Sequence, residues 1–252
     1  MRVQPRALIS IGLLIGYVAI VTLVWTLNGV DYEAVGETRD NIVQGIVIPV
    51  AFGAAFLAVA ATALGWWRPA MVEEHRAGPR WGWVLPALLL AFALSQVVSI
   101  DYSSAEVMKL LPALAVGTAL VGFSEELLTR GLMLVGFRGS FSEVWVWLFV
   151  ALSFSLLHAV NAFFGQSIVA TVQQMVVAFL IGTAFYVTRR VTGLLVVTMV
   201  IHALWDFGAI GLGDKTAPPA AGFLQYAAAI VAIILLVKIL RQPKAVEVAQ
   251  PA

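Results

Sequence analysis

Eight runs of mainly apolar residues follow one another along this chain, and each is close in length to the thickness of a bilayer. A helix that crosses the hydrocarbon core of a membrane needs roughly 20 such residues. Only short loops remain between the runs, so the sequence predicts a polytopic membrane protein. The runs are residues 7–27, 42–66, 83–100, 109–136, 144–164, 167–188, 193–211 and 223–240.

The runs are expected to be helices. Inside a bilayer only helices and closed barrels satisfy the backbone hydrogen bonds, and barrel strands alternate apolar and polar residues. Residues 42–66 do not alternate, because they are apolar apart from Gln44 and Thr62 and a few small residues. The fold class is therefore predicted as an all-α polytopic transmembrane helical bundle of about eight spanning helices. Residues 1–241 would form a single integral-membrane domain, and residues 242–252 a short disordered cytoplasmic tail.

Composition excludes several classes of protein. Hydrophobic residues make up 61% of the chain and charged residues 12%, about half the charged content of soluble domains. The net charge of +1 gives no basic excess of the kind that nucleic-acid binding requires. With no cysteine, the chain has no disulfide, no thiolate metal ligand and no cysteine nucleophile.

Positive charge predicts the orientation, because Lys and Arg accumulate on the cytoplasmic side of membrane proteins. With eight spans and the N-terminus inside, 12 of the 15 Lys and Arg residues fall on the cytoplasmic side. The three on the outside are Arg39, Lys109 and Lys215. Both termini are therefore predicted to be cytoplasmic.

Ionisable residues interrupt only a few of the apolar runs. Each costs at least about 2.5–3.5 kcal/mol at the centre of a membrane helix, so each is a candidate functional residue. Glu126 and Arg130 are four residues apart on one helix face and are expected to pair. Glu125 points away from that face without a local partner, which suits a general acid or base. The alternative is that both glutamates are solvated near the cytoplasmic mouth of the helix.

Two histidines also lie inside apolar runs. His158 is about fourteen residues into its run, and the alternative to a catalytic role is a structural hydrogen bond to a neighbouring helix. His202 and Asp206 are four residues apart and face the same way, so they can bond to each other or share a water or metal. His75 lies in a polar loop and is interpreted as a solvated surface residue.

If these residues all line one cavity, a single site would explain why ionisable side chains occur inside the apolar runs. A carboxylate and an imidazole can activate water, and a second polar pair can stabilise the oxyanion during amide hydrolysis. The open alternative is Zn²⁺, which would activate the water with ligands drawn from Glu125, His158, His202 and Asp206. The ordinary H-E-x-x-H and G-x-S-x-G motifs are absent from the sequence.

Three short motifs, in this order, resemble those of the CPBP (CAAX protease and bacteriocin-processing, or Abi) intramembrane endopeptidases. This family includes the Ras-converting CAAX prenyl endopeptidase. The motifs are Glu125-Glu126-x-x-x-Arg130, Phe154-x-x-x-His158 and His202-x-x-x-Asp206. The resemblance covers about residues 105–210.

The resemblance implies a role for each motif residue. Glu125 would be the catalytic carboxylate and His158 its partner on the attacking water, while His202 and Asp206 would form the oxyanion-stabilising or second polar site. Glu126 and Arg130 would be structural or orienting. The third motif often ends in Asn, which can donate to an oxyanion, whereas an ionised Asp206 cannot. The family has been described as both metal-dependent and metal-free.

The sequence thus predicts an intramembrane endopeptidase that acts on a membrane peptide or protein within the lipid bilayer. The alternatives are a proton- or ion-coupled transporter, since membrane-embedded Glu and His residues also form proton relays, and a non-catalytic scaffold or immunity protein. Short loops and an alanine- and valine-rich composition indicate the inner membrane of a bacterium. No nucleic-acid partner is expected.

Overall fold

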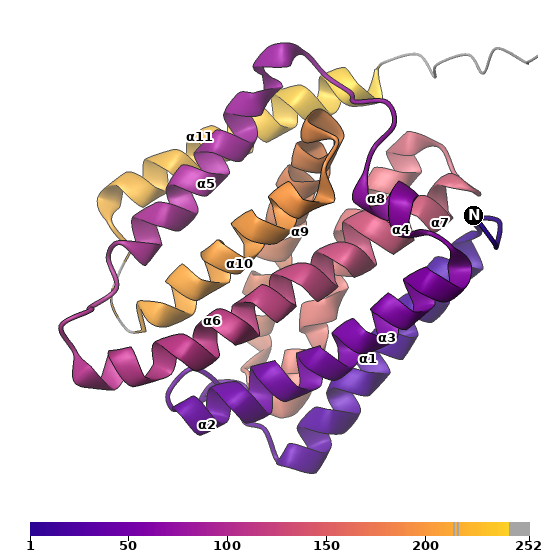
Figure 1. The fold of residues 1–252 in the computed structure, drawn as a ribbon. Helices are drawn as coiled ribbons and strands as arrows, with labels where there is room; N and C mark the ends of the chain where they lie inside the picture. Colours follow the sequence, from indigo (N-terminus) through magenta and orange to yellow (C-terminus); the bar gives the residue numbers. More distant parts are fainter. Residues whose placement is uncertain (214, 216, 242–252) are drawn as a thin grey trace, which may run out of the picture.

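In the computed structural model, which describes residues 1–213, 215 and 217–241, the chain folds into a bundle of helices (Figure 1). The predicted all-α polytopic bundle is confirmed. Each of the eight predicted runs corresponds to one helical segment of the described residues. These segments are Ala7–Asn28, Arg39–Leu64, Arg80–Val97, Ala105–Arg138, Glu143–Phe164, Ile168–Thr192, Leu195–Gly211 and Pro219–Leu240.

Four of these segments combine α-helix with a different helical geometry. The second is α2, a short π-helix η1 and α3, and the fourth is α6, the π-helix η3 and α7. The third begins with the 3₁₀ turn η2 before α5, and the fifth ends with the 3₁₀ turn η4 after α8. Their bounds are α2 Arg39–Ile42, η1 Val43–Val47, α3 Ile48–Leu64, η2 Arg80–Trp83, α5 Val84–Val97, α6 Ala105–Glu126, η3 Leu127–Met133, α7 Leu134–Arg138, α8 Glu143–Leu157 and η4 His158–Phe164.

The remaining four segments are single helices. These are α1 Ala7–Asn28, α9 Ile168–Thr192, α10 Leu195–Gly211 and α11 Pro219–Leu240, and a short additional helix, α4 Trp67–Met71, follows α3. Among the described residues, seven segments are long and apolar enough to cross a membrane, and α10, with 17 residues, is shorter. Of the eight predicted spans, α10 is thus the one that falls short of this length. It packs between α5 and α6 inside the bundle.

Glycine ends several of the helices where the chain must turn sharply, and α3 and α9 are two examples. Gly65 ends α3 and Gly193 ends α9, each with a left-handed backbone at φ 70° and 76°. A residue without a Cβ adopts this conformation without steric cost. Gly193 therefore separates α9 from α10, which begins two residues later.

The bundle has two chemically different ends. The basic end holds the N-terminus, the loops at residues 65–79 and 139–142, the α9–α10 turn and the end of α11. The acidic end holds the loops at residues 29–38, 98–104 and 165–167 and the beginning of α11. Ten of the described Lys and Arg residues lie at the basic end, namely Arg2, Arg6, Arg68, Arg76, Arg80, Arg138, Arg189, Arg190, Lys238 and Arg241.

Two members of the predicted cytoplasmic set are not among these ten residues. Arg130 is fully buried and does not contribute to either end. Lys244 and the predicted disordered tail, residues 242–252, lie outside the described residues. Both described ends of the chain lie at the basic end, which agrees with the predicted common side for the termini (Figure 1).

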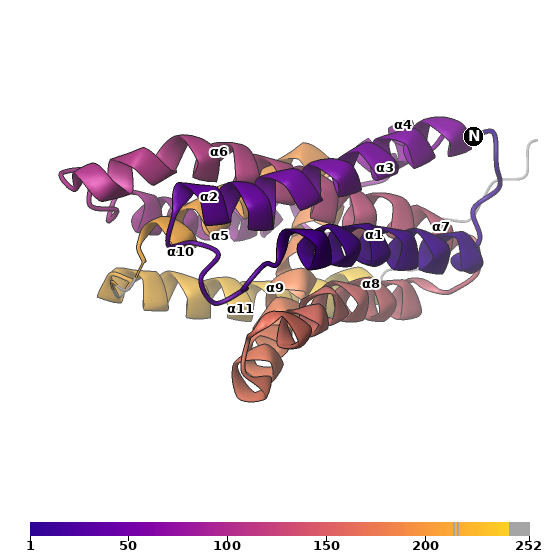
Figure 2. The ribbon, with the colours of Figure 1, turned by 90° about the horizontal axis from the view of Figure 1, so that it is seen from below.

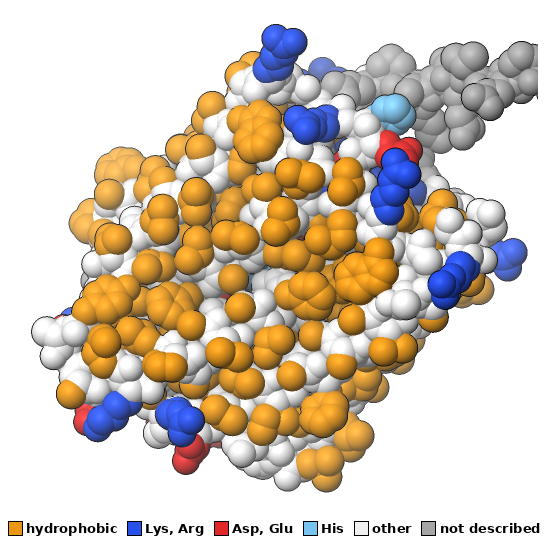
Figure 3. All heavy atoms as spheres, viewed as in Figure 1, with side chains coloured by type: hydrophobic (Ala, Val, Ile, Leu, Met, Phe, Trp, Pro, Cys, Tyr) orange, Lys and Arg blue, Asp and Glu red, His pale blue; other side chains and the backbone are white. Residues whose placement is uncertain are grey.

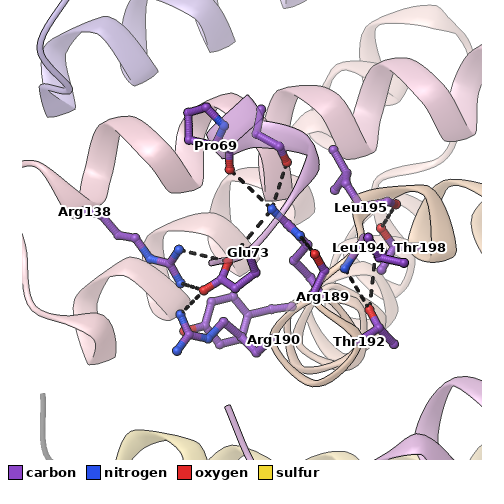
Figure 4. A network of polar contacts seen from close by, with 12 residues as sticks. Pro69, Glu73, Arg138, Arg189, Arg190, Thr192, Leu194, Leu195 and Thr198 are labelled. Atoms are coloured by element: carbon purple, nitrogen blue, oxygen red, sulfur yellow. Dashed lines mark hydrogen bonds and ion pairs between the residues drawn. The ribbon is translucent and has the colours of Figure 1, made fainter. Parts of the chain in front are cut away.

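A network of ion pairs joins four segments at the basic end (Figure 4). Glu73, in the loop after α4, is 2.9 Å from Arg138 of α7 and also contacts Arg190 of α9. Glu143, at the beginning of α8, pairs with the same two arginines at 2.7 and 2.9 Å. Arg189 donates to the carbonyl groups of Ala70 and Gly193. The network therefore fixes the loop against α7, α8 and α9.

The outer surface is apolar along the helices and charged at the ends. Figure 3 shows hydrophobic side chains covering the middle of one face, with the Lys, Arg, Asp and Glu side chains near its margins. This distribution is that of an integral membrane protein, since lipid-exposed side chains must be apolar. The end of α8 and the beginning of α9 project away from the other helices (Figure 2).

Candidate active site

A cavity of about 360 Å³ lies inside the bundle and extends toward the acidic end. Four predicted site residues line it, Glu125 from α6, His158 from η4, and His202 and Asp206 from α10. A second cavity of about 140 Å³ shares His158, His202 and Asp206 with the first and reaches between α9 and α10. The structure therefore brings together residues that are up to 81 positions apart in the chain.

Glu126 and Arg130 form a buried pair behind the cavity. Arg130 Nη1 donates to Glu126 Oε1 at 2.7 Å and to Thr129 Oγ1 at 2.9 Å, and both charged side chains are fully enclosed. The guanidinium also lies 4.1 Å from the centre of the Phe154 ring, which favours a cation. The predicted i,i+4 pairing is present in the structure.

His202 lies between three carboxylates. Its Nδ1 is 3.2 Å from Glu126 Oε1, and its Nε2 is 3.5 Å from Asp206 Oδ2 and 4.0 Å from Glu125 Oε2. Because both ring nitrogens face acceptors, both are placed to donate. Glu125, at 4.0 Å, lies beyond hydrogen-bond distance and keeps its carboxylate directed into the cavity.

One ring nitrogen of His158 is hydrogen-bonded to the backbone, and the other is available to a ligand in the cavity. Its Nδ1 is 3.0 Å from the carbonyl oxygen of Phe154, and because a carbonyl can only accept, Nδ1 carries the hydrogen. Nε2 is then the acceptor nitrogen of the neutral ring. The 3₁₀ geometry of η4 begins at this residue, so the end of α8 places the imidazole at the cavity wall.

The helices change geometry close to the candidate catalytic residues. The α-helical part of α6 ends at Glu126, and the π-helix η3 carries Arg130. Short π segments inside α-helices occur frequently at functional sites, because they reorient the side chains that follow. Gly122 permits a close contact here, since a Cβ at this position would lie 2.5 Å from the carbonyl oxygen of Met199 on α10.

A catalytic zinc site would require three of these side chains to converge on one ion. Within the described part of the chain, no group of three or more His, Asp or Glu side chains is placed to hold a metal ion. His202 uses Nδ1 on Glu126, and Glu126 is itself bound by Arg130. As placed, the side chains therefore do not fit the three-ligand arrangement of a catalytic zinc centre.

Several cavity residues lie outside the three motifs. Tyr17 and Trp25 come from α1, Tyr32 from the loop after it, Asn161 from η4 and Gln174 from α9. These residues were not predicted, because aromatic and amide side chains are common in membrane helices and loops. An amide three residues after His158, inside an apolar run, was a signal that the sequence contained.

A comparison with known protein families found a match in the central part of the chain. Residues 107–208 match the model of the family described as type II CAAX prenyl endopeptidase Rce1-like. The chain is therefore similar to this family over these residues, which make up less than half of its length. The matched residues include all three motifs, and their limits agree with the expected range of 105–210. No curated protein and no solved structure matches the chain.

The matched residues are similar to peptidases of the CAAX protease type. The apolar helices indicate an integral membrane protein. Helix α1, the loop after it and helix α3 lie outside the matched residues, yet Tyr17, Tyr32 and Val50 line the same cavity as Glu125. The cavity is thus completed by segments beyond the matched residues.

Proposed function

We propose that this chain is an intramembrane endopeptidase that hydrolyses a peptide bond of a membrane-associated peptide or protein. The observation that carries the proposal is the cavity itself. Inside an apolar bundle, α6, η4 and α10 place Glu125, His158, His202 and Asp206 around one cavity. Desolvating so many ionisable groups is costly, which favours a functional reason for the arrangement.

In the proposed mechanism, Glu125 and His158 activate one water molecule. His158 Nε2 accepts a hydrogen bond from the water, and Glu125 removes its proton as the oxygen attacks the carbonyl carbon of the substrate. The tetrahedral intermediate then collapses, the C–N bond breaks, and Glu125 returns the proton to the departing amine. The products are a carboxylic acid and an amine, so one water is consumed for each bond cleaved.

The other motif residues would maintain this geometry. Arg130 neutralises Glu126, and Glu126 in turn holds His202 at 3.2 Å. Asp206 contacts the opposite nitrogen of His202 at 3.5 Å. His202 is therefore fixed beside Glu125 and forms, with Asp206, the second polar site of the cavity. A location in the bacterial inner membrane and the absence of a nucleic-acid partner remain predictions from composition.

The proposal predicts that Glu125→Gln and His158→Ala abolish cleavage. Either change removes a general acid–base group, which costs roughly 10²- to 10⁴-fold in rate. Bacterial membranes containing wild-type protein or a variant would be compared by mass spectrometry of newly formed N-termini. New N-termini that require Glu125 and His158 identify cleavage sites and substrates together.

Two surface residues supply the matched controls. Glu106→Gln changes an exposed glutamate at the beginning of α6, and His75→Ala changes an exposed histidine at the basic end, so both should cleave like wild type. If Glu125→Gln and His158→Ala also cleave like wild type, the proposal is wrong. Chelation of the purified protein tests the zinc alternative, and the metal-free mechanism predicts unchanged cleavage after metal removal.

A further inference from the structure

The motif residues offer few hydrogen-bond donors to the substrate's carbonyl oxygen. Nε and Nη2 of Arg130 have no partner but are fully buried, and Nε2 of His202 lies 3.5 Å from Asp206. Glu125 and Asp206 are acceptors when ionised, and both nitrogens of His202 face carboxylates. His158 Nδ1 is held by the Phe154 carbonyl. The guanidinium of Arg130 is fully buried against Glu126 and Phe154. Hydrolysis of an amide places negative charge on that oxygen, and a donor there is a large part of catalysis.

Tyr32 lies at the wall of the same cavity, and its hydroxyl oxygen accepts one hydrogen bond. Gln174 Nε2 donates to Tyr32 Oη at 2.9 Å. The amide of Gln174 is oriented in turn by Asn161, whose Nδ2 donates to Gln174 Oε1 at 2.9 Å. In this chain of bonds the Tyr32 oxygen accepts, so its own hydrogen is left to donate elsewhere.

The position of Tyr32 is fixed by contacts on both sides. Its backbone N–H donates to the carbonyl of Phe164 at 2.7 Å, which joins the loop after α1 to the end of η4. Its ring lies 5.7 Å from that of Trp25, centre to centre. Burial, together with the nearby carboxylates of Asp206 and Glu125, raises the pKa of Tyr32 above its ordinary value of 10.0. The phenol therefore remains a donor at neutral pH.

Tyr17 provides a contrast within the same cavity. Its hydroxyl lies 3.0 Å from Ser124 Oγ, and Ser124 Oγ itself donates to the carbonyl of Val121. Tyr17 must then donate to Ser124, so its hydrogen is already used. Of these two cavity tyrosines, Tyr32 is the one with an available hydrogen.

We propose that Tyr32 is a catalytic residue that donates a hydrogen bond to the substrate carbonyl oxygen and to the oxyanion formed from it. The inference rests on the proposed peptidase function. It also explains why an aspartate can occupy position 206. If Tyr32, in the loop after α1, supplies the donor, an amide side chain is not required at position 206. Asn161 and Gln174 are then positioning residues that keep the Tyr32 hydroxyl pointing into the cavity.

The test is Tyr32→Phe, which removes the hydroxyl and keeps the ring against Trp25. The substrate is a fluorescent, quenched peptide that spans the strongest cleavage site found by the comparison of N-termini. Loss of one oxyanion donor costs on the order of 10²- to 10³-fold in kcat, and KM should change little. Tyr102→Phe is the matched control, because Tyr102 is an exposed loop tyrosine at the same end of the bundle.

A second variant separates catalysis from folding. Asp206→Asn introduces an amide donor into the cavity, so Tyr32→Phe/Asp206→Asn should regain at least tenfold in kcat over Tyr32→Phe. A folding defect would not be rescued in this way. Wild-type kcat in Tyr32→Phe, or a loss that Asp206→Asn does not restore, overturns the inference. Because Glu125→Gln is assayed beside these variants, failure of Tyr32 is distinguishable from failure of the peptidase function.

Discussion

Glu73 and Glu74 are neighbours in the chain but lie in opposite environments. The Glu73 side chain is 5% exposed and contacts Arg138, Arg189 and Arg190, with the Arg138 pair at 2.9 Å. The Glu74 side chain is 70% exposed and lies 3.7 Å from Arg68. Both residues belong to the same polar stretch of the sequence, and nothing in their order shows which of the two turns inward.

This difference predicts unequal effects on stability. Glu73→Gln leaves three arginines without their common carboxylate, and breaking a buried ion pair costs about 3–5 kcal/mol. Glu74→Gln removes only an exposed pair and should leave the free energy of unfolding unchanged. Denaturant unfolding of the purified proteins in detergent measures both. Equal midpoints for the two variants would show that the Glu73 network does not stabilise the fold.

The motif residues illustrate how far spacing alone could predict the site. The four-residue interval between Glu126 and Arg130 predicted their pairing, because those positions share a helix face. The same argument left Glu125 without a partner, and the structure directs it into the cavity. Local spacing could not predict that His202 contacts Glu126, which lies 76 positions earlier in the chain.

At the scale of elements, the contact between α6 and α10 sets the geometry of the cavity. Gly122 lies three residues before Glu125, and Ala203 follows His202 directly. A Cβ on Gly122 would lie 2.5 Å from Met199 O and 2.9 Å from Ala203 N. Both are backbone atoms, so the two helices approach this closely only because residue 122 has no side chain.

Gly122→Ala is therefore expected to separate the two helices. Overpacking of this kind costs about 1–3 kcal/mol, and a shift of about 1 Å between reacting groups can lower the rate on the order of 10²-fold. Cleavage of the quenched peptide and thermal unfolding measure the two effects. Gly12→Ala is the control, because nothing lies within 4 Å of its added Cβ. Equal activity of the two variants would contradict the close α6–α10 contact.

At the scale of the whole molecule, the two ends determine how the protein sits in a membrane. Ten described Lys and Arg residues lie at the basic end, and Arg39, Lys109 and Lys215 lie at the acidic end. Positive charge is retained on the cytoplasmic side. The basic end is therefore expected to face the cytoplasm, and the cavity to extend toward the opposite side.

The absence of cysteine makes this orientation directly measurable. His75→Cys places a single thiol at the basic end, and Ser103→Cys places one in the loop between α5 and α6 at the acidic end. In intact bacterial cells, a membrane-impermeant maleimide should label Ser103→Cys. It should label His75→Cys only after the cells are permeabilised. The reverse pattern would invert the predicted topology.

The sequence by itself determined the class of fold, the number and order of the helical segments and the residues most suited to chemistry. It could do so because each apolar run depends on its own length and composition, and because a charge in lipid is costly wherever it occurs. Only the tertiary structure decided which side chains share the cavity. It brought Tyr32 and Gln174 to Asn161, gave His202 its three carboxylates, and turned Glu73 inward. These contacts depend on how helices pack over long separations, which local spacing does not specify.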